Sequence, residues 1–227
     1  MERHFDEELA DLKKNILEMG SLVEAAIVKS IEALKQQSKS IANEVIANDK
    51  IIDEMELKID EQCLDLLALR QPMAIDLRFV TMAMKINTDF ERIADLAVDI
   101  AQRALELCDK PLVKPLIDIP KLTQVAISMV HDVLTAFVNN DPKFSASIIL
   151  KDAEADMLRD TIQTELITGY MMKDASTVQR AVSLLLIARH LERICDHATN
   201  IAEDVIYMVK ARVVKHHPEN LKNKNVC

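Results

Sequence analysis

Four pairs of carboxylates stand four residues apart in segments with helical periodicity. The pairs are Asp49 with Asp53, Glu91 with Asp95, Asp152 with Asp156, and Glu192 with Asp196. Residues at this spacing lie one turn apart on the same helix face, so two like charges repel unless a cation lies between them. Carboxylate oxygens are hard ligands that suit Mg²⁺, Mn²⁺ or iron, and they also bind Zn²⁺. The pairs therefore predict metal sites, with the identity of the ion left open.

An internal repeat distinguishes these pairs from the other acids of a chain that has 37 Asp and Glu residues. The segment FERIADLAVDIA (90–101) matches LERICDHATNIA (191–202) at seven of twelve positions, and the pair at 49 and 53 aligns with the pair at 152 and 156. Neighbouring acids lose their carboxylates in the repeat: Glu56, Asp60 and Glu61 fall opposite Arg159, Gln163 and Thr164. We therefore expect two carboxylate sites, one in each half.

Other polar residues lie close to the pairs on the same helices. Asp99 is one turn beyond Asp95 and is a possible additional ligand, as is its weaker counterpart Asn200. Arg92 and Arg193 directly follow a paired Glu, so they could contact the ligands or bind an anion. The alternative without metal is that the acids form helix-face salt bridges with Arg92, Arg193, Arg78 or Lys85.

Two histidines support competing hypotheses. His190, followed by acidic Glu192, resembles the acceptor of a phosphotransfer domain, but the repeat places Asp89 opposite it. His197 adjoins Asp196, as the base of a metal-dependent phosphohydrolase on a helical bundle would, but the repeat does not keep it either. A third alternative is a purely structural helical adaptor whose acids bind nothing.

The composition indicates an all-α protein and excludes several classes of function. The 227 residues include only 2 Gly, 6 Pro and no Trp. Nucleotide motifs need closely spaced glycines, whereas Gly20 and Gly169 are far apart. A net charge of −9 argues against nucleic-acid binding and leaves membrane contact to partner proteins.

Sorting signals and cysteine spacing favour a cytoplasmic protein. The segment MERHFDEELADLKK carries charges where a secretion signal would be apolar, and no stretch is long and apolar enough to cross a bilayer. No C-x-x-C spacing occurs, so we expect reduced thiols at Cys63, Cys108, Cys195 and Cys227.

Six long helices position the acidic pairs. Apolar periodicity and helix-breaking residues predict them at about 3–36, 39–69, 75–108, 120–138, 142–169 and 176–215. The proline-rich segment 110–119 connects two three-helix repeats, at 1–109 and 120–215, and 216–227 is expected to be a flexible tail. Long apolar seams make a homodimer plausible.

Three segments resemble the PhoU family of phosphate-transport accessory proteins. They are RQPMAIDLR (70–78), ERIADLAVDIA (91–101) and LERICDHATNIAEDV (191–205). The resemblance covers nearly the whole chain. It implies two three-helix bundles side by side and metal clusters held by the paired acids of each half.

The resemblance also implies a regulator that is not an enzyme. Such a protein restrains the phosphate-starvation response when phosphate is plentiful, between the phosphate ABC transporter and a membrane sensor histidine kinase. At position 200 this chain has Asn where an acidic row would continue.

Overall fold

Long helices account for nearly all of residues 2–215, which are the residues that this computed structural model describes. The first half contains α1 (Glu2–Gln36), α2 (Lys39–Arg70) and α3 (Ala74–Leu107). The second contains α4 (Asp118–Asn139), α5 (Pro142–Ile149), α6 (Asp152–Thr164) and α7 (Val178–Lys210). The described residues form no strand, which confirms the all-α fold class. The expected flexible tail, with Cys227, lies outside the described residues.

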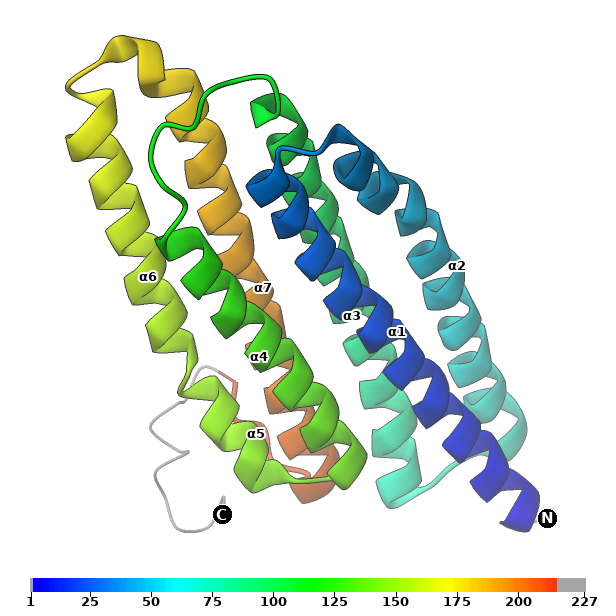
Figure 1. Cartoon of the computed structure of the whole chain (residues 1–227). Helices are drawn as coiled ribbons and strands as arrows, with labels where there is room; N and C mark the ends of the chain where they lie inside the picture. The colour runs from blue at the N-terminus through cyan, green and yellow to red at the C-terminus, as the bar shows by residue number, and fades with distance from the viewer. Residues whose placement is uncertain (1, 216–227) are drawn as a thin grey trace.

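The two halves lie side by side, with α3 and α7 in contact between them (Figure 1). In each half one helix lies on the outer side: α2 packs on α1 and α3, and α6 packs on α4 and α7. Consequently the acidic pairs of α2 and α3 belong to one side of the molecule, and those of α6 and α7 to the other. Within residues 2–215, no helix combines the length and apolar composition needed to cross a lipid bilayer.

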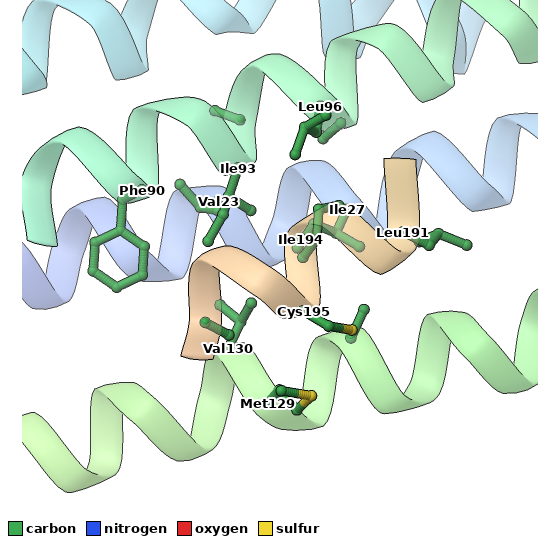
Figure 2. Packing of buried hydrophobic residues seen from close by; sticks show 14 of the residues in the cluster. Val23, Ile27, Phe90, Ile93, Leu96, Met129, Val130, Leu191, Ile194 and Cys195 are labelled. Atoms are coloured by element: carbon green, nitrogen blue, oxygen red, sulfur yellow. The ribbon is translucent and has the colours of Figure 1, made fainter. Parts of the chain in front are cut away.

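One hydrophobic core continues through both halves. The seam predicted for the first helix is buried at Leu12, Ile16, Met19 and Val23. Figure 2 shows that side chains of α1, α3, α4 and α7 meet in the same region; they include Val23, Ile27, Phe90, Ile93, Met129, Val130, Leu191 and Ile194. The halves therefore share one core, and burial of apolar surface is the dominant favourable contribution to folding.

Local capping explains where several helices begin. Ser38 is the N-cap of α2, and its side chain accepts a hydrogen bond from the backbone N–H of Ile41. Asp141 caps α5 by accepting from the N–H groups of Lys143 and Phe144, while Pro142 occupies the first turn. Sequence signals of these kinds placed the helix starts near residues 39 and 142 correctly.

The single helix predicted for residues 142–169 is wrong in detail. It divides at Leu150 and Lys151 into α5 and α6, and its last part is a π-helical segment, η1 (Glu165–Met171). Lys151 forms an ion pair with Asp132 of α4 at the division, which fixes the start of α6 against its neighbour. Neither Gly nor Pro marks the division, so residue type gave no signal for it.

The last helix ends earlier than predicted. Helix α7 stops at Lys210, because Ala211 adopts a left-handed conformation with φ 53° and its N–H bonds to the carbonyl of Tyr207. Beyond this turn, Val214 is buried with Ala146 of α5 and Ile206. The burial of Val214 explains why the chain turns away before the predicted end near residue 215.

Candidate metal centre

The first acidic cluster lies where α2 faces α3. Asp49 and Asp53 come from α2, and Glu91 and Asp95 from α3. The pKa of Asp49 is raised first by burial, then by Asp53 on the same helix and by Asp95 across the helix pair. Glu56, which was set aside in the sequence because the repeat does not keep it, belongs to the same group and adds to the electrostatic repulsion on Glu91.

Partial burial and repulsion make this cluster unfavourable when fully ionised. Burial is the main cause that raises the pKa of Glu91 from 4.5 to about 7, and the negative charge of Asp95 is the next. Burial also raises the pKa of Asp49 and Asp95, with Asp53 as the largest charged contributor to each. A bound cation would remove this repulsion.

The second cluster has the same plan on α6 and α7. It contains Asp152, Asp156, Glu192 and Asp196. Burial first, and then the charge of Asp196, raises the pKa of Asp152 from 3.8 to about 6. The structure thus brings together all eight predicted site residues, four in each half.

The donor set fits a hard cation, although the side chains are not arranged around one. Each cluster offers carboxylate oxygens from two neighbouring helices, which is the chemistry that Mg²⁺, Mn²⁺ and iron prefer. Within the described part of the chain, no three His, Cys, Asp or Glu side chains form a group that could hold an ion without rearrangement. Side-chain rotation would therefore accompany binding.

The additional ligands and the arginines differ in how close they lie to the clusters. Asp99 raises the pKa of Asp95, so it borders the first cluster, and its carboxylate lies 3.7 Å from Nδ1 of His190 on α7. Asn200 is half-buried on α7. Arg92 lowers the pKa of Glu91, and Arg193 lowers that of Asp196. Neither arginine has an ion pair within 4 Å in residues 4–215.

The salt-bridge alternative is realised in the second half, but through a residue that sequence reasoning did not select. The guanidinium of Arg159 lies 3.0 Å from Asp156 and 3.4 Å from Glu192. The partners considered from the sequence bind elsewhere: Arg78 donates to the carbonyl of Met208, and Lys85 lies 3.9 Å from Asp204. The sequence signal that could have identified Arg159 is that the repeat places it opposite an acid, Glu56.

His197 and His190, considered from the sequence as a hydrolytic base and a phosphate acceptor, both lie in contacts between α7 and α3. His197 is buried, and its Nδ1 donates to a carboxylate oxygen of Asp89 at 2.7 Å, which joins α7 to α3. The side chain of His190 is only 14% exposed and faces Asp99. Both imidazoles are therefore largely covered, and each lies against a carboxylate of α3. Cys63, Cys108 and Cys195 are free thiols, as expected.

Comparison with known proteins identifies the repeat. The PhoU domain profile matches twice, at residues 16–104 and 119–205. The phosphate-specific transport system accessory protein PhoU homolog of Zymomonas mobilis is 38% identical over 98% of this chain and 92% of its own length. The accessory protein PhoU of Escherichia coli K12 is 36% identical over 93% of this chain and 88% of its own length.

A solved structure agrees with the sequence comparisons. The crystal structure of PhoU from Pseudomonas aeruginosa superposes with a TM-score of 0.88 at 36% identity, and the match covers 92% of this chain and all of that one. The shared helices include both halves. With the two domain matches and the near full-length relatives, this similarity shows that the chain belongs to the PhoU family.

Proposed function

We propose that this chain is a regulatory accessory protein of phosphate uptake. It restrains a phosphate ABC transporter and a sensor histidine kinase through protein contacts on the cytoplasmic side when phosphate is plentiful. The observation that carries the proposal is the near full-length similarity to the accessory protein of E. coli, with the domain present in both halves. The names of the relatives describe accessory and regulatory proteins, in agreement with a role that is not enzymatic.

The architecture suits a protein that acts by presenting surfaces. A continuous core fixes the long helices relative to one another. On the outer helix α2, Leu57, Leu64 and Leu69 are 68%, 57% and 72% exposed. These side chains offer apolar contact area on an outer face of the bundle. We infer that α2 contributes to the surface that meets the transporter, and that the protein acts as a homodimer.

Metal binding is the second part of the proposal. Asp49, Asp53, Glu91 and Asp95 would hold a cation in the first half, and the corresponding four acids would do so in the second. The ion would compensate the negative charge of the carboxylates. Because the ligands come from two helices, it would also link α2 to α3 in the first half and α6 to α7 in the second. Burial and mutual repulsion raise the pKa of Asp49 and Glu91, and this repulsion is the property that the ion would change.

A complementation experiment tests the regulatory role. The chain is produced in an E. coli strain without its own accessory protein, and a phosphate-starvation reporter is measured at high phosphate. We expect the reporter to be repressed. A reporter that stays active while folded protein accumulates would contradict the proposed role.

Two further measurements test whether the acids bind a metal ion and whether the protein is a hydrolase. Calorimetric titration with Mn²⁺ should show binding that the double variant Asp53→Asn, Asp95→Asn weakens and the control Glu61→Gln does not. Turnover of phosphomonoesters by the Mn²⁺-treated protein would instead favour the hydrolase alternative.

A further inference from the structure

Arg159 makes the second acidic cluster different from the first. Its guanidinium lies 3.0 Å from Asp156, 3.1 Å from Asp160 and 3.4 Å from Glu192. Asp156 and Asp160 belong to the same helix as Arg159, whereas Glu192 belongs to α7. One side chain therefore forms ion pairs with two of the four candidate ligands and also bridges the two helices.

In the part of the chain that the structure describes, no cation lies within ion-pair distance of the first cluster. Glu56 occupies the repeat position of Arg159, and Leu57 occupies that of Asp160. Within residues 4–215, none of the ion pairs shorter than 4 Å involves Glu56 or the four candidate ligands of the first half. Glu56 and Leu57 together carry one negative charge, whereas Arg159 and Asp160 together carry none, so the two clusters differ by one unit of local charge.

Arg159 lies at the edge of a groove on the protein surface. Its side chain is 29% exposed. It lines a groove of about 720 Å³ between α6 and α7, together with Arg189 and Arg193. Because the groove is open to solvent, the guanidinium has space to leave the cluster without disturbing the core.

We propose that Arg159 is a built-in counter-cation of the second cluster, so that a divalent cation binds preferentially to the first. The preference of the divalent cation rests on the proposed metal binding, whereas the role of Arg159 as counter-cation does not. In the second half, an incoming cation must displace the guanidinium. In the first half, the bound ion replaces repulsion among acids with attraction.

Substitutions at the equivalent positions 159 and 56 test the proposal most directly. Arg159→Gln removes the counter-cation, and Glu56→Arg introduces one into the first cluster. Arg189→Gln is the matched control, because it removes a positive charge from the same groove without breaking an ion pair within 4 Å. Arg159→Lys tests whether a positive charge alone restores the behaviour.

Mn²⁺ titration by calorimetry and by electron paramagnetic resonance measures the preference. We expect one tight site in the unaltered protein and a second site in Arg159→Gln, strengthened by on the order of tenfold, the size of the repulsion between a divalent ion and one positive charge at about 5 Å in water. Glu56→Arg should weaken the first site by a similar factor. Equal binding to both clusters, unchanged in Arg159→Gln, would overturn the preference.

Thermal unfolding without metal tests the counter-cation independently of metal binding. Arg159→Gln should lower the midpoint by about 2–4 °C, the effect of about 1 kcal/mol in a chain of this size. Arg159→Lys should recover part of the loss, and Arg189→Gln should change little. If no Mn²⁺ binds the unaltered protein, the metal part of the proposed function is wrong, while a lower midpoint still supports Arg159 as the counter-cation. An unchanged midpoint in Arg159→Gln would refute that role.

Discussion

Protonation of Glu91 should stabilise the metal-free protein as the pH falls from 8 to 6. Burial and the charge of Asp95 raise the pKa of this carboxyl from 4.5 to about 7. The folded state therefore binds the proton more tightly than the unfolded state between these two values, and stability increases as the pH falls through 7. The stabilisation is complete below about pH 4.5 and absent well above 7.

The magnitude follows from the two pKa values. Between pH 8 and pH 6 the shift is worth about 1.3 kcal/mol in the free energy of unfolding. Glu91 is partly exposed, so solvent screening reduces this to about 0.7 kcal/mol. For a chain of 227 residues the midpoint of thermal unfolding should then rise by about 2 °C.

Differential scanning calorimetry in the presence of a chelator measures this effect. Because histidines also titrate in this range, the informative quantity is the difference between the unaltered protein and Glu91→Gln, which cannot ionise. Glu61→Gln, an exposed glutamate elsewhere on α2, is the control. If Glu91→Gln and the unaltered protein show the same pH dependence, repulsion at Glu91 does not limit stability and the reasoning is wrong.

Three substitutions test the fold. Phe90→Ala should lower the free energy of unfolding by about 3–5 kcal/mol, measured by urea titration, because the side chain is fully buried. His197→Ala should cost about 1–3 kcal/mol because Asp89 loses its buried donor, and recovery of stability in the double variant Asp89→Leu, His197→Leu would confirm that reason. Asp141→Ala should cost about 1 kcal/mol by removal of the α5 cap, and hydrogen exchange should increase in α5 but not in α4.

Local rules explain why much of the fold could be predicted. Ser38 and Asp141 act through atoms two or three residues away, so their positions in the sequence suffice to place a helix start. By contrast, the division at Leu150 and the turn at Ala211 depend on packing. Val214 packs with Ala146 of α5 and Ile206 of α7, and no local pattern contains these contacts.

The same distinction holds for the site. Helical spacing and the repeat were enough to select eight acids that the fold brings into two groups. Arg159 could not be predicted in this way, because the repeat was used to find acids that are present in both halves. Arg159 is informative because it differs from Glu56 at the equivalent position. Its role became visible only once α6 was placed against α7.

The shared core has a consequence for the history of the chain. Helix α3 packs against α7 at the boundary between the halves, and Phe90 and Ile93 of α3 share one buried apolar region with Ile194 of α7 (Figure 2). Hydrogen bonds between the halves, such as that from Arg78 to the carbonyl of Met208, lie along the same boundary. A single three-helix ancestor would have exposed this apolar face, and a second copy of itself is the partner that fits it. Gene duplication would then have converted an association between two molecules into a permanent one, after which each half was free to acquire its own charge.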